Sequence, residues 1–114
     1  MSGRRAAFVA RLARLLNDYR EQRPDLLLEV RPFFSGAAAY VEGHIFMSLT
    51  PVGLAFKLPA ESRRRLLDEG AVPLRYFPKA PVKKSYVLLT KEQAEDRSLV
   101  FDLIGRSVAF AIES

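Results

Sequence analysis

Apolar and aromatic residues alternate with turn residues through residues 31–59, a pattern typical of short strands joined by tight turns. The apolar runs are interrupted at Ser35-Gly36, Glu42-Gly43 and residues 51–53. These breaks carry glycine, which tolerates positive φ, or proline, which fixes φ. We therefore expect four strands, at about residues 29–34, 37–42, 44–50 and 53–58.

A helical period marks residues 4–22. One apolar stripe recurs every three to four positions, at Phe8, Leu12, Leu15, Leu16 and Tyr19. Arginines occupy much of the remaining surface, and two interpretations of them are open. They form either a solvated face with local pairs such as Arg14 with Asp18, which we favour, or a face that follows phosphate groups. Pro24 ends this helix, because the residue before a proline avoids the α conformation.

Residues 26–30 allow two interpretations, since they could extend the first helix or begin the first strand. Pro24 lies before this segment and Pro32 after it, and both favour an extended connection into the sheet. Farther along, a short helix is expected to begin near Pro59, where a missing N–H group costs nothing. It should bury Leu66 and Leu67, and Gly70 is a good residue for the position that follows its end.

The carboxyl-terminal part predicts a second strand pair and a long last helix. The strands are expected at residues 73–77 and 83–89, across a turn at residues 78–81. Thr90 and Gln93 have the spacing of a capping box, and Asp96 is a candidate N-cap for the last helix. The apolar side of that helix consists of Leu99, Val100, Leu103, Ile104, Val108 and Ala111.

Together these elements predict an α+β fold with two layers. An antiparallel sheet of five to six strands should carry helices on one side, in the order α-β(3–4)-α-β(2)-α. With 114 residues, the chain should form a single domain spanning residues 1–114. We expect the core to contain Leu15, Phe34, Tyr40, Phe46, Phe56, Leu66, Tyr86 and Leu103.

The net charge of the chain is only a weak indication of the kind of partner that it binds. The formal net charge is +5, and most of the basic residues are arginines, which favours acidic partners. A possible basic contact surface comprises Arg63, Arg64, Arg65, Lys83 and Lys84. Arg11 and Arg14 interrupt the amino-terminal apolar run, so we expect neither a secretion signal nor a membrane span, and the expected location is the cytoplasm.

Candidate catalytic chemistry is sparse in this sequence. Cysteine is absent, and His44, beside a turn glycine, is the single histidine. Ser35 or Ser48 could formally join a catalytic triad, but no nucleophile elbow accompanies them. The glycine at position 36 precedes a strand and not a helix, so it does not match a phosphate loop. We expect no catalytic, cofactor or metal site.

Several short motifs resemble the TfoX (Sxy) N-terminal domain family. The run from Arg31 to Gly36 is similar to its Arg-x-Met-Phe-Gly-Gly signature, with Phe33 in place of methionine and Ser35 in place of the first glycine. Ala37, Ala38 and Ala39 stand where the family has a Gly-x-Gly run. The resemblance covers roughly residues 5–112. Its other matching positions are Tyr40, Glu42-Gly43, Phe46, Leu54, Lys57, residues 73–77, Lys84-Ser85-Tyr86 and the apolar last helix.

The resemblance implies the same two-layer fold and a place beside regulators of competence development, in which this domain precedes a separate second domain. We therefore expect a non-enzymatic regulatory or protein-interaction module. The alternative is a small basic nucleic-acid-binding accessory protein that uses the basic surface named above. Salt-dependent binding to generic DNA distinguishes the two, because phosphate contacts weaken steeply as salt rises.

Surplus apolar residues on the last helix predict self-association. Phe101, Phe110 and Ile112 lie off its main apolar stripe, so some of them should stay exposed in a monomer. The expected partner is a second copy of the chain in a two-fold homodimer. Alternatively, the amino-terminal helix covers these residues within the same chain.

Overall fold

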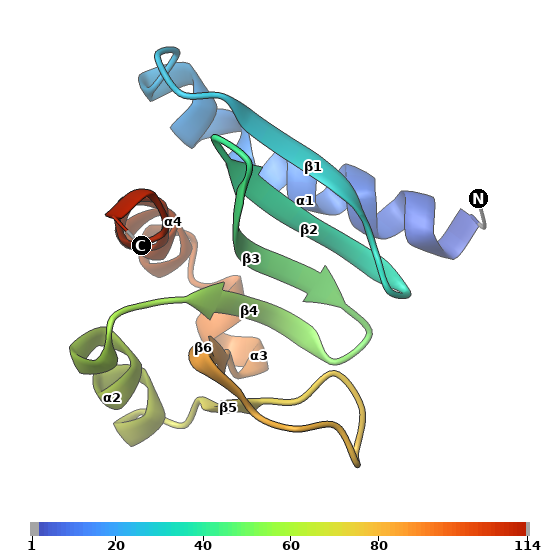
Figure 1. Cartoon of the computed structure of the whole chain (residues 1–114), viewed down its shortest axis with the longest axis vertical. Coiled ribbons are helices and arrows are strands. Elements are labelled where there is room, and N and C mark those ends of the chain that lie inside the picture. Colours follow the sequence, from blue (N-terminus) through green and yellow to red (C-terminus); the bar gives the residue numbers. More distant parts are fainter. Residues whose placement is uncertain (1–2, 114) are drawn as a thin grey trace.

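The computed structural model describes residues 3–113 and shows four helices and six strands within that range (Figure 1). In chain order the elements are α1 (Gly3–Gln22), β1 (Leu28–Phe33), β2 (Gly36–Val41), β3 (His44–Thr50), β4 (Gly53–Lys57), α2 (Ala60–Asp68), β5 (Val72–Leu74), β6 (Lys83–Leu88), α3 (Lys91–Glu95) and α4 (Arg97–Glu113). The segment at residues 26–30 therefore leads into a strand, as its flanking prolines predict.

The strands of residues 3–113 form one antiparallel sheet in the order β1-β2-β3-β4-β6-β5. Strands β1 to β4 are joined by consecutive hairpins, and β6 pairs with β4 after the excursion through α2 and β5. Both edge strands carry a proline, Pro32 in β1 and Pro73 in β5, and a proline discourages further pairing at an edge. The α+β prediction with an antiparallel sheet is confirmed.

Two long helices cover one face of the sheet. Helix α1 packs on β1 and β2, and α4 packs on β3 and β4, so both lie behind the sheet in Figure 1. Between them and the sheet lies a continuous apolar cluster. Its fully buried members include Leu12 and Leu16 of α1, Phe46 and Phe56 of the sheet, and Ile104 of α4.

The core prediction is correct for Phe46, Phe56, Leu66 and Leu103, whereas Tyr40 and Tyr86 are half-buried. It is wrong for two residues. The side chain of Leu15 is 36% exposed, because one residue is about 100° of helix rotation and Leu15 lies at the edge of the stripe that contains Leu16. The side chain of Phe34 is 56% exposed, because β1 ends at Phe33 and Phe34 occupies the following turn with φ of 51°.

The two tightest turns use glycine for different reasons. At the β2–β3 turn, Glu42 and Gly43 both have positive φ, and the Glu42 carboxylate accepts a hydrogen bond of 2.6 Å from the Leu27 amide. At the β1–β2 turn, by contrast, Gly36 is needed for close approach. A Cβ atom there would lie 2.3 Å from the carbonyl oxygen of Leu49. The sequence had indicated a need for positive φ at this turn, and Phe34 meets that need instead.

A buried glutamine connects the end of α2 to the start of α3. The predicted capping box is present: Thr90 Oγ1 accepts from the Gln93 amide, and Gln93 Oε1 accepts from the Thr90 amide. The Gln93 side-chain nitrogen also lies 3.5 and 3.4 Å from the carbonyls of Leu66 and Glu69. One side chain thus satisfies backbone groups at two helix ends.

Helix α2 ends at Asp68 with Glu69 as its C-cap, and Gly70 follows with φ of 112°, as predicted. The expected burial of Leu67 is wrong: it is 39% exposed, because it lies about 100° around the helix from the buried Leu66.

Two polar side chains fix the position of helix α4, one at its start and one near its middle. Asp96 caps its first turn, because its carboxylate accepts from the Leu99 amide at 3.1 Å. Near the middle of the helix, the buried Ser107 Oγ lies 2.6 and 2.7 Å from the carbonyls of Phe46 and Lys57. The one hydroxyl proton of Ser107 is therefore shared between a carbonyl of β3 and the carbonyl of the last residue of β4.

On the open face of the sheet, the segment after β5 crosses back over the strands. Tyr76 packs its ring against Phe33 and Phe34, with centroids 5.4 and 5.2 Å apart, and its hydroxyl forms a 2.9 Å hydrogen bond with Ser48. The strand predicted at residues 73–77 is therefore too long. It ends at Leu74 because the tyrosine leaves the sheet edge to cover β1 and β3.

Burial on this face predicts sensitivity to alkali. Desolvation raises the pKa of the Tyr86 phenol above its ordinary value near 10. The stability that comes from the neutral phenol is complete below that value and is lost as pH rises through it, because the unfolded chain ionises first. We expect Tyr86→Phe to lose less free energy of unfolding than the wild type between about pH 9 and pH 11 in urea titrations. Equal losses in both proteins would contradict this account.

Candidate functional site

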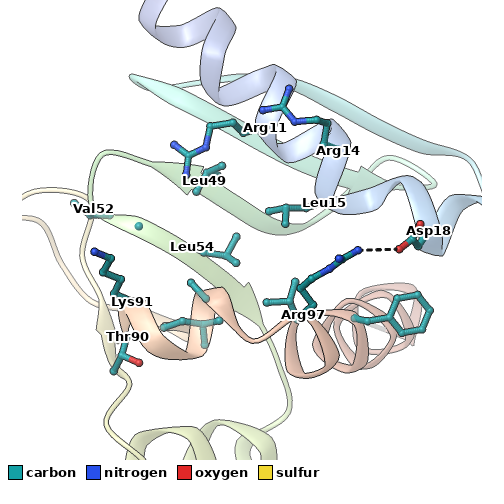
Figure 2. Close-up of a pocket in the computed structure, with 15 residues that line it drawn as sticks. Arg11, Arg14, Leu15, Asp18, Leu49, Val52, Leu54, Thr90, Lys91 and Arg97 are labelled. Carbon is teal, nitrogen blue, oxygen red and sulfur yellow. Dashed lines mark ion pairs between the residues drawn. The ribbon is translucent and has the colours of Figure 1, made fainter.

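A groove with a volume of about 570 Å³ lies between α1 and the α3–α4 segment, above the β3–β4 hairpin (Figure 2). We call it the α1–α4 groove. Its volume is within the range of small-ligand pockets. The groove is lined by Arg11, Arg14, Leu15, Asp18, Leu49, Val52, Gly53, Leu54, Leu89, Thr90, Lys91, Ala94, Arg97, Val100 and Phe101.

Helical geometry explains the wall that α1 supplies. Positions 11, 14, 15 and 18 follow the i, i+3, i+4, i+7 spacing, which places them on one flank of the helix. The adjacent stripe with Leu12 and Leu16 is buried in the core. Helix α1 therefore uses one apolar face for folding and turns Leu15, at the edge of that face, toward the groove.

The floor of the groove is aliphatic. Leu49 of β3 pairs with Leu54 of β4 across the hairpin, and both lie in the middle of the groove beside Leu15 in Figure 2. Val100 of α4 completes the floor from the other side. The ends of these buried side chains are the surface that an apolar ligand group would meet.

The rims of the groove are cationic. Arg11 and Arg14 extend from α1, and Lys91 and Arg97 extend from the opposite wall (Figure 2). Among the described residues that line the groove, Asp18 is the single carboxylate. It lies 3.9 Å from Arg97 in a pair that is highly exposed and therefore weak. In the part of the chain from residue 3 to residue 113, the other three cations form no ion pair. The groove consequently has an excess of positive charge.

The predicted pairing of Arg14 with Asp18 is not formed. Asp18 pairs with Arg97 of α4 instead, and Arg11 lies over the ring of Phe8 at 5.5 Å. The reason is the packing of the start of α4 beside α1, which brings a second cation close to the carboxylate. Arg11 and Arg14 of α1 thus form one side of a groove. The sequence had offered two interpretations of these arginines, a solvated face and a face that follows phosphate groups, and neither of them includes a groove.

The residues of the predicted basic surface lie outside this groove. Arg63 is half-buried, and its guanidinium donates to the carbonyl of Leu58. The Leu58 amide donates to the Ser85 carbonyl at 2.9 Å, so the start of α2 adjoins the strand that carries the two lysines. Four of the five predicted cations are exposed around this junction: Arg64, Arg65, Lys83 and Lys84.

The three residues of the predicted association surface have different environments. Phe101 is half-buried and packs edge-on against Tyr19 of α1, with ring centroids 6.0 Å apart. Phe110 is half-buried, and Ile112 is 46% exposed. Phe101 and Phe110 are about two and a half helical turns apart, so they lie on opposite sides of α4. Helix α1 therefore covers Phe101, and the exposed apolar surface near the end of α4 centres on Ile112.

The part of the chain that the structure describes shows neither a candidate metal site nor a helix that could cross a membrane. His44 is exposed at the start of β3. Residues 3–113 contain no group of three or more histidine, cysteine, aspartate or glutamate side chains that could hold a metal ion. Over the same residues, every helix is too short or too polar to cross a membrane.

We expect His44→Ala to leave the fold and any binding activity unchanged, because the side chain is exposed beside a turn. Surface substitutions of this kind change the free energy of unfolding by about 0.5 kcal/mol or less. Thermal unfolding of the wild type and the variant measures the change in stability. The zinc or nickel content of both proteins after chelation measures metal binding. Stoichiometric metal in the wild type that is lost in the variant would contradict the prediction.

Part of the α1–α4 groove could have been found from the sequence. The signal is Leu15 at the edge of an apolar stripe, with Arg11 and Arg14 on the same flank. The opposite wall, with Lys91 and Arg97, carries no such signal. It faces α1, which lies at the other end of the chain, and no local sequence pattern shows that the two segments meet. The most prominent basic pattern in the sequence is instead the run of consecutive arginines in α2.

Comparison with known proteins identifies the family. No curated protein and no solved structure matches the chain. The family model of the TfoX N-terminal domain matches residues 27–111, which is well over half of the chain and confirms the resemblance seen in the sequence. The match begins after α1, so the wall of the groove with Arg11, Arg14 and Leu15 lies outside it. The chain belongs to the TfoX N-terminal domain family.

Proposed function

We propose that the protein is a non-enzymatic, cytoplasmic regulatory module that acts by binding another protein in the α1–α4 groove. Membership of the TfoX N-terminal domain family supports a regulatory or interaction module in general. The observation that carries the proposal is an aliphatic floor between two cationic rims. More specifically, we propose a regulatory role of the kind that competence regulators perform.

The composition of the groove supports binding in preference to catalysis. Apart from Asp18 and Thr90, its lining consists of apolar residues and cations. A general base must lie within hydrogen-bond reach of the proton that it removes, and a nucleophilic side chain must be activated, for example by such a base. The side chains here instead provide apolar contact area and charge attraction, which are the usual components of a protein interface.

Affinity capture from the native host tests this function with a matched pair of variants. Leu15→Glu places a charge on the apolar part of the α1 wall, beside the groove floor. Leu67→Glu makes the same change on α2, where the side chain is 39% exposed against 36% for Leu15. A defined protein should be recovered with the wild type and with Leu67→Glu, and be lost with Leu15→Glu. Circular dichroism confirms that both variants fold. Equal recovery with all three proteins, or no enriched protein, would overturn the proposal.

Nucleic-acid binding is the second candidate, and the junction of α2 with β6 is the observation that favours it. Arg64 and Arg65 are exposed on α2, and Lys83 and Lys84 are exposed on the adjoining strand. Phosphate contacts at such a surface lose affinity steeply as salt increases. Fluorescence anisotropy with generic duplex DNA at rising salt measures this. Tight, salt-dependent binding that Arg64→Glu weakens would favour this candidate over the first.

Self-association remains a separate proposal. The apolar surface that supports it is Ile112, 46% exposed near the end of α4. We expect sedimentation equilibrium at micromolar concentration to show a homodimer that Ile112→Glu converts to a monomer, because a buried unpaired charge is costly at an interface. A wild-type protein that stays monomeric at all concentrations would remove the dimer.

A further inference from the structure

We infer that the α1–α4 groove binds an acidic amphipathic helix of a partner protein. The inference rests on the proposed function and adds the chemical class of the partner. It comes from the order of side chains across the groove, which is cation, aliphatic floor, cation (Figure 2). A helix with an apolar stripe flanked on both sides by carboxylates has the complementary order.

The apolar stripe of such a helix would meet Leu15, Leu49 and Leu54. Leu15 is 36% exposed, and Val52 at the end of the groove is 38% exposed, so docking removes apolar surface from water at both positions. Helix-in-groove recognition uses apolar anchors at i, i+3, i+4 and i+7. The groove extends along the part of α1 from Arg11 to Asp18, which is about two helical turns and accommodates those anchors.

The distribution of charge favours a ligand with several carboxylates. Arg11 and Arg14 are about one turn apart on one wall, while Lys91 is on the other wall, with Leu49 and Leu54 between them in Figure 2. One carboxylate on a small molecule contacts one wall only. A helix about 10 Å wide presents acidic side chains to both walls while its stripe contacts the floor. Charge complementarity of this kind speeds association and selects the partner.

The same observations disfavour a nucleic acid in this groove. Single-stranded nucleic acids bind where bases stack on exposed aromatic rings beside a basic track. The aromatic residue in the groove lining is Phe101, and it is half-buried against Tyr19. The rest of the floor is aliphatic, which suits leucine-like side chains better than bases.

A designed peptide tests the inference directly. The probe is a fluorescein-labelled helix of about 14 residues, with leucines in an i, i+3, i+4, i+7 stripe and glutamates on both flanks. Two control peptides keep its length: one replaces every glutamate with glutamine, and one scrambles the order to destroy the stripe. We expect saturable anisotropy with the probe, weakened at high salt, and at least about tenfold weaker binding for each control.

Protein variants connect the binding to the groove. The double variant Arg11→Glu with Arg14→Glu should weaken the probe about tenfold or more, because attraction on one wall becomes repulsion. The matched control is Arg64→Glu with Arg65→Glu, which makes the same change of charge at exposed positions of α2 and should bind the probe like the wild type. A generic single-stranded oligonucleotide should not displace the probe.

Three results would overturn the inference: equal weakening in both double variants, equal binding of the glutamate and glutamine peptides, or displacement by the oligonucleotide. The proposed function fails in a different way. If capture yields a partner that depends on Leu15 while the acidic probe does not bind, the partner class is wrong and the interaction site stands. If no captured protein depends on Leu15, the site itself is wrong.

Discussion

Replacing Phe46 with alanine is expected to lower the free energy of unfolding by about 3–5 kcal/mol, and replacing Phe56 should have a similar effect. Both side chains are completely buried in the apolar cluster between the sheet and the helices. Met47 pairs with Phe56 across the β3–β4 ladder, so the strand positions are constrained and the cavity left by a missing ring can close only in part. Urea unfolding at neutral pH measures both changes.

The matched control for these variants is Phe77→Ala. The side chain of Phe77 is 58% exposed, so the same chemical change should alter the free energy of unfolding by no more than about 0.5 kcal/mol. Wild-type stability in both Phe46→Ala and Phe56→Ala would show that these rings do not form the core. A loss in Phe77→Ala equal to theirs would indicate a contact that the exposed position does not provide.

Gly36→Ala is the second large effect that we expect, with a loss of about 3 kcal/mol in the free energy of unfolding. The added Cβ atom would lie 2.3 Å from the Leu49 carbonyl oxygen and 2.7 Å from the Cα atom of Thr50. Both are backbone atoms of β3, which pairs with strands on its two sides. They cannot move away without disturbing the ladder. Thermal and urea unfolding should both show the loss.

Two other glycines serve as controls because the same substitution meets different surroundings. At Gly105, inside α4, a Cβ atom would lie 3.7 Å from the ring of Tyr19, an ordinary contact. Gly105→Ala should therefore raise stability by about 0.5–1 kcal/mol through helix propensity. At Gly43 the added atom meets nothing within 4 Å, but φ is 84°, so a loss of about 1–2 kcal/mol is expected from backbone strain. Equal effects at all three glycines would contradict the close-approach argument.

The secondary structure of this chain was largely determined by its sequence, because the signals that specify it act over a few residues. The capping pair of Thr90 and Gln93 spans one turn of helix, and Asp96 caps α4 within the next residues. Glu42 and Gly43 define the β2–β3 hairpin by their own φ angles. The antiparallel α+β architecture follows from the order of such elements.

The boundaries of the strands near the open face depended on tertiary contacts. The sequence indicated a strand to residue 77, but Tyr76 leaves the edge to pack on Phe33 and Phe34 and to bond Ser48. The role of Gly36 is equally non-local, because the space that it leaves is occupied by the backbone of β3. A residue's own propensity contains no information about a strand that approaches it from elsewhere in the chain.

The candidate site was determined mainly by the tertiary structure. The sequence showed a run of arginines on α2, and consecutive charges are easy to recognise, yet those residues lie outside the groove. Along α1 it showed an apolar stripe and its basic flank, but not that Leu15 would line a groove. Only the packing of α1 beside α4 places Lys91 and Arg97 opposite Arg11 and Arg14 (Figure 2). Helices α1 and α4 lie side by side because both bury their apolar faces against the same face of the sheet. This packing makes neighbours of charges from opposite ends of the chain, and local sequence patterns do not specify it.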